Sequence, residues 1–379
     1  MALPMAKWLW VVRNCLADGK MALGGAKLPC RWQNCLAGGK IALPMGKSPE
    51  WENPPFYAII FLMTKIDEVS KKVKNSVGQV FKGNPDTLDM ILAAIFAGGH
   101  ILLEDLPGTG KTVLAKALAK SFDLPFSRIQ CTPDLMPSDV TGSSVWLPSS
   151  QQFEFRPGPV MSSLVLVDEL NRATPRTQSA LLECMAENQV TVDGVKHSLE
   201  KPFFVIATEN PVESEGTFPL PEAQKDRFMI CLSLGYPSQN DEAEIITAQR
   251  SLSHPLEKVQ PVTNKEEILE CMEEASQIHV DQAVLTYLIS LATATRGDYR
   301  LAAGVSPRAS IALYKASQAY AAVNDRSFVT PEDIKHLALP VFRKRIILNN
   351  DSILKGYSSE NIIEELIEQL PLPSFKAHQ

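Results

Sequence analysis

The sequence offers little that would support a disulfide framework, a membrane span or a broad nucleic-acid surface. Its 379 residues include only seven cysteines and no C-x-x-C pair, so we expect neither a zinc site nor disulfides. Scattered cysteines in apolar segments are typical of reduced, buried side chains in a cytoplasmic protein. There is no run of about 18 apolar residues, which a membrane-spanning helix would need. The net charge of −6 argues against a nucleic-acid partner.

Residues 1–47 are unlike the rest of the chain because they contain an internal repeat. MALPMAKWLWVVRNCLADGK is followed by MALGGAKLPCRWQNCLAGGK, and IALPMGK begins a third copy. The segment is basic, as transit peptides and membrane-surface anchors are, but its copies differ at positions that a repeated core would keep constant. We therefore favour a third interpretation, in which residues 1–62 are disordered or not part of the native fold, and the folded chain opens at Met63.

From residue 63 to residue 237, short apolar runs alternate with helical stretches. This alternation is typical of an α/β fold with a parallel sheet and helices on both faces. The runs centred on Leu102, Leu166 and Ile206 are nearly all apolar, as expected for strands buried on both faces. The predicted strands are residues 100–105, 126–131, 163–169, 203–209 and 228–234.

After residue 237 the strand-like runs stop, and residues 238–379 are predicted to form a smaller, all-helical lid domain. Two helix starts are well marked. Thr263 precedes Glu266 in the pattern of a capping box, and Thr330 precedes a proline and two acidic residues. The predicted helices are residues 240–251, 264–276, 281–295, 307–322, 331–338 and 359–369.

The stretch ILLEDLPGTGKTVLAKALAK, residues 101–120, nearly matches the phosphate-binding motif G-x-x-x-x-G-K-[ST], although Asp105 stands in place of its first Gly. A strand leads into the loop, glycines give the backbone freedom, and a helix predicted to begin at Lys111 adds its N-terminal N–H groups. Lys111 would reach the β- and γ-phosphates of ATP, and Thr112 would bind Mg²⁺. The predicted nucleotide-binding residues are Pro107, Gly108, Thr109, Gly110, Lys111, Thr112, Val113 and Asp168.

Two further strands end in polar residues that could act on the same phosphates. Asp168 and Glu169 end the run LVLVDE, where Asp168 could bind the metal ion and Glu169 could polarise a water for attack on the γ-phosphate. Asn210 ends FFVIATEN and could help to hold that water. An acid pair at a strand exit and an Asn before a Pro also occur in ordinary turns.

Two arginines could complete the site. Arg227 precedes the last predicted strand, and Arg308 lies in the first turn of a helix capped by Ser306 with Pro307 at its first position. A guanidinium suits a γ-phosphate because it stays charged and can bind two oxygens at once. Either arginine could instead form a solvent-facing salt bridge.

The order of these residues resembles that of the AAA+ ATPases, and longer strings resemble the MoxR family within them. The resemblance runs from about residue 64 to residue 350 and is carried by RIQCTPDLMPSDVTG (128–142), FEFRPGPV (153–160), DELNRATPRTQSALLECMAENQVTVDG (168–194), ATENPVESEGTFPLPEAQKDRF (207–228) and GVSPRA (304–309). It implies that Lys111 belongs to Walker A, Asp168 and Glu169 to Walker B, and Asn210 to sensor 1. It also implies that Arg227 is the arginine finger and Arg308 is sensor 2.

The resemblance further implies a ring, usually a hexamer, with ATP bound between subunits. Arg227 would act on the neighbour's nucleotide, whereas Arg308 would act from the lid of the same chain. The resemblance also implies a chaperone that remodels a partner protein or inserts its metal cofactor. That partner is often a protein with a von Willebrand factor A domain. Residues 142–159 look like the helix-2 insert hairpin, and residues 188–199 look like the hairpin before sensor 1.

The chain departs from the family pattern at a few positions. Asp105 replaces the first Gly of the loop, but it ends a strand and is not expected to need a positive φ. Glu209 stands where Gln is common, which adds a negative charge near the site. Lys344 stands where His is common.

Two other functions remain open from the sequence alone. One is an assembly switch that binds ATP and hardly hydrolyses it, although Glu169 and Asn210 would then be unneeded. The other is a DNA motor, which the 40 acidic against 30 basic residues of positions 63–379 disfavour. A partner of the magnesium-chelatase type is also possible by analogy of fold.

Overall fold

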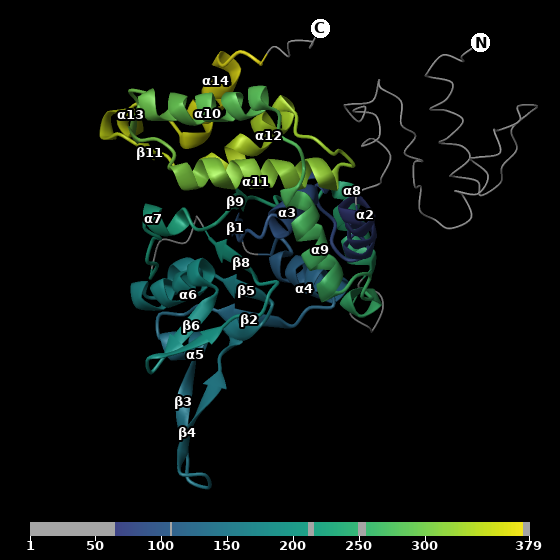
Figure 1. Cartoon of the computed structure of the whole chain (residues 1–379), viewed down its shortest axis with the longest axis vertical. Coiled ribbons are helices and arrows are strands. Elements are labelled where there is room, and N and C mark those ends of the chain that lie inside the picture. The colour runs from purple at the N-terminus through teal and green to yellow at the C-terminus, as the bar shows by residue number, and fades with distance from the viewer. Residues whose placement is uncertain (1–64, 107, 211–215, 249–254, 374–379) are drawn as a thin grey trace, which may run out of the picture. The chain divides into compact units, whose positions relative to one another are not determined.

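The computed structural model describes residues 65–106, 108–210, 216–248 and 255–373 (Figure 1). These described residues all belong to one compact unit. The expectations for residues 1–62 and the nucleotide-binding role of Pro107 therefore lie outside the described residues. Within the described ranges, no helix is both long and apolar enough to cross a bilayer.

A five-stranded parallel sheet forms the centre of the unit, which confirms the predicted fold class. The strand that carries Ile206 and Ala207 pairs with one neighbour through Ala207 beside Leu102, and with its other neighbour through Ile206 beside Leu166. All five predicted strands are confirmed to within two residues at each end. In sheet order they are β2 (Phe126–Gln130), β5 (Leu164–Asp168), β8 (Phe204–Glu209), β1 (Ile101–Glu104) and β9 (Ile230–Leu232).

Both faces of the sheet are buried, which explains why its strands lack polar–apolar alternation. Successive side chains of a strand point to opposite faces. Leu103 and Leu166 accordingly belong to one apolar cluster, whereas Leu102 and Val167 belong to another. The first cluster includes side chains of α2 (Lys65–Val77), α3 (Pro85–Phe96), α4 (Lys111–Ser121) and α9 (Lys265–Ser276), and the second includes side chains of α5 (Pro137–Thr141) and α6 (Pro175–Glu187).

The predicted helix after Met63 is confirmed as α2. Its apolar positions Ile66, Val69, Val73 and Val77 are all buried, as their spacing on one helix face predicts. Helix α4 begins at Lys111, as the phosphate-loop motif predicts.

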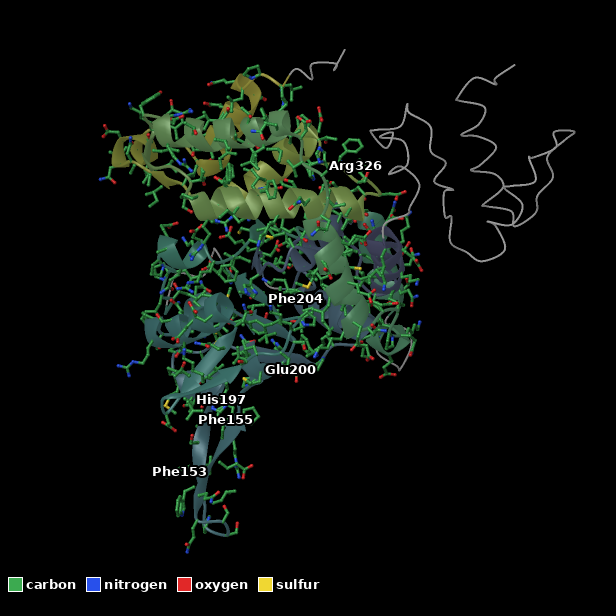
Figure 2. All side chains as sticks on the ribbon, viewed as in Figure 1. Phe153, Phe155, His197, Glu200, Phe204 and Arg326 are labelled. Carbon is green, nitrogen blue, oxygen red and sulfur yellow. The ribbon has the colours of Figure 1, made fainter. Side chains whose placement is uncertain are left out.

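Two antiparallel hairpins confirm the inserts that the resemblance implies. Strands β3 (Gly142–Leu147) and β4 (Gln152–Pro157) form one, and β6 (Gln189–Val192) and β7 (Val195–Ser198) form the other. Figure 1 shows the β3–β4 hairpin extending away from the sheet. The hairpins meet where Phe155 stacks on His197, with ring centroids 3.8 Å apart (Figure 2).

The other described residues from 216 onward are mostly helical. Their elements are α7 (Glu222–Lys225), α8 (Gln239–Ala248), α10 (Gln282–Gly297), α11 (Pro307–Val323), α12 (Pro331–Phe342), α13 (Asn350–Leu354) and α14 (Ser359–Gln369), with the short strands β10 (Leu301–Ala303) and β11 (Ile347–Leu348). The capping box at Thr330 is confirmed. The one at Thr263 is wrong, because Asn264 caps α9 and accepts from the N–H of Glu267 at 2.9 Å.

The predicted boundary between residues 237 and 238 stays a prediction. Helix α9 lies after that boundary but contacts α2 and α3 as well as α11. Beyond it, α10, α11, α12 and α14 contact one another, α11 packs on α2 and α3, and α12 packs on β9.

Candidate functional site

The phosphate loop has the backbone that anion binding requires. Gly108 and Gly110 both have φ of +87°, a conformation that is costly for any residue with a side chain. Nothing lies within 4 Å of the position that a Cβ at Gly108 would take. Gly110 caps α4, so the N–H groups of Lys111, Thr112 and Val113 form the first turn and have no partners within the helix. The loop therefore presents N–H groups and a helix N-terminus.

The ammonium group of Lys111 is bound by the loop's own backbone. Its Nζ donates to the carbonyl oxygens of Asp105 at 2.8 Å and Leu106 at 3.3 Å. Burial lowers the pKa of Lys111, and the nearby carboxylates of Asp105, Asp168 and Glu169 act in the opposite direction. The last two are the predicted Walker B acids, so the structure brings them within electrostatic reach of the predicted Walker A lysine.

Asp105 is buried, and its carboxylate has a defined role. It accepts hydrogen bonds from the Ser233 hydroxyl at 2.7 Å and from the N–H groups of Leu234 at 2.7 Å and Gly235 at 3.1 Å. Its φ is not positive, as expected from its place at the end of β1. A glycine here could not bind this segment.

The acid pair lies at the carboxyl end of β5, beside the ends of β2 and β8. Asp168 is buried and accepts from Arg128 Nε at 2.6 Å and from Thr208 Oγ1 at 3.4 Å. Glu169 has φ of +56°, and its N–H donates to Thr208 Oγ1 at 2.9 Å. This left-handed conformation marks the turn at which the chain leaves the strand.

The Glu169 carboxylate has two partners of its own. It accepts from Gln130 Nε2 at 3.0 Å and from Arg172 Nη1 at 3.0 Å. Sequence reasoning missed Arg128, Gln130, Arg172 and Thr208. Arg128 and Gln130 could have been recognised because they are polar residues near the end of β2. This strand lies at the edge of the sheet, and most of its residues are not buried.

Asn210 follows β8 directly and is buried at the same sheet edge. Its main-chain oxygen accepts from Asn171 Nδ2 at 3.4 Å, which connects it to the turn after the acid pair. The parallel register places the end of β8 between those of β5 and β1. Lys111, the acid pair and Asn210 are thus gathered at one edge of the sheet.

Both predicted arginines adjoin Asp226, because Arg227 follows it in the sequence and Arg308 lies close to its carboxylate. Arg308 is largely exposed, and its Nη1 lies 3.9 Å from Asp226 Oδ2, to which the capping residue Ser306 also donates at 3.1 Å. Arg227 is partly buried and donates from Nη1 to the Leu182 carbonyl of α6 at 2.8 Å. The predicted N-cap and first-turn geometry of Arg308 is confirmed. The roles of both arginines toward a γ-phosphate stay predictions.

The residues present fit ATP and Mg²⁺. The loop offers unpaired helix N–H groups, and Lys111 is an ammonium group whose hydrogen bonds in the structure are to carbonyl oxygens of its own loop. Thr112 in the first turn and Asp168 at the strand end supply the oxygen ligands that Mg²⁺ prefers. Phe81 borders the loop, since its ring would lie 3.6 Å from a Cβ at Gly110.

Two departures from the family pattern, Glu209 and Lys344, meet through a shared neighbour. Glu104 pairs in register with Glu209 and forms ion pairs with Lys344 Nζ at 2.8 Å and Arg343 Nη2 at 3.2 Å. Burial, together with the nearby Glu104 carboxylate, raises the pKa of Glu209 to about 7, although Lys225 and Lys344 act in the opposite direction. Lys344 and Glu209, the two residues that depart from the family pattern, therefore both lie beside Glu104.

The raised pKa of Glu209 predicts a pH-dependent effect of its neutral isostere. The folded chain holds this proton more tightly than the unfolded chain, so its contribution to stability is lost as pH rises from about 4.5 to about 7. Glu209→Gln removes the cost of ionisation, and we expect it to stabilise the fold by about 1–2 kcal/mol at pH 8 and by little at pH 5. Urea unfolding at both pH values measures this, with exposed Glu187→Gln as the control. An equal effect at pH 5 and pH 8 would contradict the prediction.

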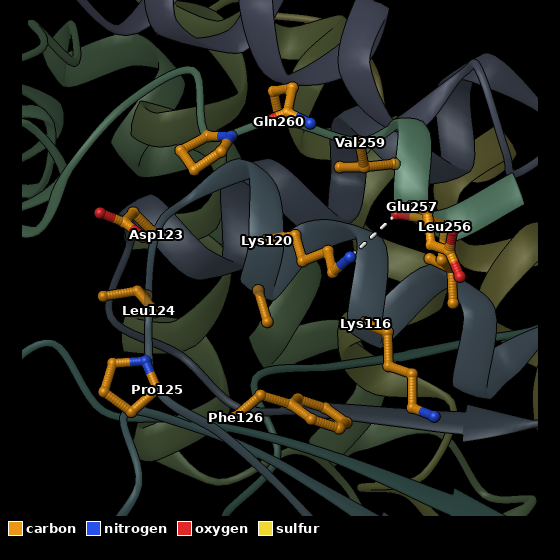
Figure 3. Close-up of a pocket in the computed structure, with 12 residues that line it drawn as sticks. Lys116, Lys120, Asp123, Leu124, Pro125, Phe126, Leu256, Glu257, Val259 and Gln260 are labelled. Carbon is orange, nitrogen blue, oxygen red and sulfur yellow. Dashed lines mark hydrogen bonds between the residues drawn. The ribbon is translucent and has the colours of Figure 1, made fainter. Parts of the chain in front are cut away.

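A pocket of about 860 Å³ lies away from the phosphate loop and the acid pair (Figure 3). It is bordered by the C-terminal half of α4, the start of β2 and residues 256–261, and Lys120 Nζ donates across it to the Leu256 carbonyl at 3.0 Å. The phosphate loop precedes the opposite end of α4. The pocket therefore belongs to the other edge of the sheet and does not form part of the candidate site.

Comparison with known proteins agrees with this geometry. Residues 100–230 match the family model described as ATPase family associated with various cellular activities (AAA), and residues 293–366 match that of the AAA lid domain. The chain is 46% identical to the uncharacterized protein YeaC of Bacillus subtilis, over 80% of this chain and 94% of that protein. It is 35% identical to Chaperone MoxR1 of Mycobacterium tuberculosis, over 79% and 81% of the two chains.

A solved structure from Cytophaga hutchinsonii, of a protein described as an ATPase, is similar as well. It superposes with a TM-score of 0.76 at 39% sequence identity, over 82% of this chain and 96% of that chain. The similarity thus extends over the sheet, the hairpins and the helices that follow.

Proposed function

We propose that this chain, which belongs to the MoxR family of AAA+ ATPases and has a chaperone-like role, hydrolyses ATP with Mg²⁺. We also propose that it does so as a ring, most simply a hexamer. The observation that carries this proposal is the convergence of the Lys111 ammonium and the acid pair Asp168 and Glu169 at one edge of the sheet. The four cysteines of the described residues are free and buried, which supports a reducing, cytoplasmic location.

The residues divide the chemistry of phosphoryl transfer between them. Lys111 would leave its backbone acceptors and bind the β- and γ-phosphates, while Thr112 and Asp168 would hold Mg²⁺, which when bound neutralises developing charge on the phosphates. Glu169 would orient and deprotonate the attacking water, with Asn210 nearby to fix its position. Catalysis would then consist mostly of positioning and of stabilising charge.

We further propose that hydrolysis drives remodelling of a partner protein or insertion of its metal cofactor. The relative named Chaperone MoxR1 supports the chaperone part of this role. The β3–β4 hairpin supports it too, since it extends from the sheet (Figure 1). Its apolar side chains Trp146 and Phe153 are exposed. A protein with a von Willebrand factor A domain is the partner that the family resemblance suggests. No nucleic acid is required.

The full chain tests this proposal directly. Phosphate release from ATP should need Mg²⁺, and the rate per subunit should rise about tenfold over the concentration range in which the chain assembles, because the neighbour completes the site. Sedimentation velocity follows assembly in the same samples. A rate per subunit that stays constant while the chain assembles would contradict a site shared between subunits. Tight ATP binding with almost no turnover would support an assembly switch instead.

Nucleic acid provides the control for the remaining alternative. Duplex and single-stranded DNA should neither bind in 150 mM salt nor change the hydrolysis rate, because the chain is acidic overall. Stimulation by DNA that weakens as salt is raised would instead favour a motor.

A further inference from the structure

The end of strand β1 carries two adjacent carboxylates that both contact segments far along the chain. Glu104 is the last residue of β1, and Asp105 follows it. Side chains of successive strand residues point in opposite directions, so the two carboxylates can bind different partners. The phosphate loop begins directly after them, at Leu106. Both carboxylates therefore lie directly before the start of the loop.

Asp105 binds the segment that leads from the sheet to the helical part of the chain. Its two carboxylate oxygens accept three hydrogen bonds, from Ser233 Oγ, Leu234 N and Gly235 N, at 2.7, 2.7 and 3.1 Å. Asp105 is 5% exposed, so these bonds form largely away from water, where a charged acceptor binds its donors strongly. Gly235 has φ of +68° and marks a turn directly after β9.

Glu104 binds the end of helix α12, which belongs to the region that matches the AAA lid domain. It forms ion pairs with Arg343 and Lys344, and all three side chains are less than one third exposed. Strand β9 pairs with β1 and also contacts α12. The residues before the phosphate loop are thus bonded both to residues 233–235, which we call the hinge segment, and to the lid.

The same residue, Asp105, also contacts the lysine of the loop. Its main-chain oxygen accepts from Lys111 Nζ at 2.8 Å, while its side chain holds the hinge segment. When Lys111 turns toward a phosphate, it leaves the Asp105 and Leu106 carbonyls, and the backbone that carries the Asp105 carboxylate loses one of its restraints. The position of Asp105 therefore depends on what Lys111 binds.

We infer that Glu104 and Asp105 are positioning residues that couple the phosphate loop to the lid, so that nucleotide binding places Arg308 relative to the site. The inference rests on the ATP site proposed above. Asp105 acts on the hinge segment, and Glu104 acts on the end of α12. Neither residue needs to touch the nucleotide. The inference also gives the Asp105 carboxylate a role at the position where the general loop motif has glycine.

Hydrogen–deuterium exchange of the full chain tests the coupling, because the Leu234 and Gly235 amides donate directly to Asp105. In the wild type, a non-hydrolysable ATP analogue with Mg²⁺ should change exchange in the peptide covering 233–236 by at least about threefold. In Asp105→Asn, exchange there should be fast and independent of nucleotide. Turnover at saturating ATP should fall about tenfold, with KM changed by less than about threefold. Exposed Asp123→Asn is the matched control and should behave as wild type.

Other outcomes would overturn the inference. A purely structural role predicts that Asp105→Asn melts at a lower temperature but keeps both the nucleotide response at 233–236 and its turnover per folded chain. If Asp105→Asn does not fold, Ser233→Ala decides, because it removes only one of the three hydrogen bonds and should weaken the response. Failure of the ATP site itself is distinguishable, since the wild type would then not bind a fluorescent ATP analogue. Binding by the wild type without any response at 233–236 would overturn the coupling alone.

Discussion

Glu169→Gln should bind ATP as the wild type does and hydrolyse it at least about 10²-fold more slowly, because a positioned general base contributes about 10²–10⁴-fold. The substitution keeps the shape of the side chain. The Gln carbonyl oxygen can still accept from Gln130 and Arg172, so the turn with positive φ has no new reason to change. Only the negative charge and the ability to take a proton are lost.

Binding and turnover separate in this variant because different residues carry them. The loop N–H groups and Lys111 belong to α4 and its cap, whereas Glu169 follows β5. Equilibrium binding of a fluorescent ATP analogue and steady-state phosphate release should be measured on the same preparation. Glu187→Gln, an exposed glutamate at the end of α6, is the matched control and should retain both. Unimpaired phosphate release from Glu169→Gln would show that another group activates the water.

The outcome also decides between an ATPase and an assembly switch. A switch that depends only on binding would not respond to Glu169→Gln, since its assembly would be the same before and after the substitution. An ATPase should instead accumulate assembled, ATP-bound rings, because hydrolysis is the step that releases them. Sedimentation velocity with and without ATP distinguishes the two.

Most of the sheet could be predicted because its signal is local. Runs such as LVLV in β5 are buried on both faces, and burial on both faces requires apolar residues at successive positions. The phosphate loop was also readable, since its glycines, lysine and helix start lie within a few residues. Helix α2 followed from four apolar positions on one face. In each case the interactions that decide the structure lie close together in the sequence.

The contacts that sequence reasoning missed join distant segments. Asp105 was recognised as a departure from the loop motif, but its partners lie at residues 233–235, and no local pattern connects them. Glu209 and Lys344 were noted separately, and their shared neighbour Glu104 became visible only once β1, β8 and α12 were placed. A single sequence contains no signal for such pairs.

The wrong cap of α9 has a different cause. Thr263 and Asn264 are adjacent, both are good capping residues, and each has a glutamate three positions later. The pattern therefore fits two starts one residue apart. The structure selects Asn264, while Thr263 donates its hydroxyl to Glu267 Oε2 at 2.7 Å. The Thr263 N–H also donates to the Ser121 carbonyl at 3.3 Å, so both polar groups of Thr263 are engaged outside the capping position.

The second large effect concerns Arg227. Within one chain its guanidinium donates to the Leu182 carbonyl of α6, and its Nε is buried without a partner among the described residues. A phosphate in the neighbouring subunit would supply the acceptor that this Nε lacks within the described part of its own chain. Arg227→Ala should therefore keep ATP binding and lose about 10³-fold in turnover, the range that an arginine finger contributes. Exposed Arg156→Ala is the matched control.

Mixing two inactive variants tests whether Arg227 acts across subunits. Lys111→Ala chains cannot hold the phosphates but still offer Arg227, whereas Arg227→Ala chains hold ATP and lack the finger. In a ring with head-to-tail contacts, a one-to-one mixture should regain about one quarter of the wild-type rate, because about one interface in four unites an intact loop with an intact arginine. Mass spectrometry of intact rings confirms that subunits have mixed. Mixed rings that stay inactive would mean that Arg227 supports its own chain through α6 and does not reach the neighbour.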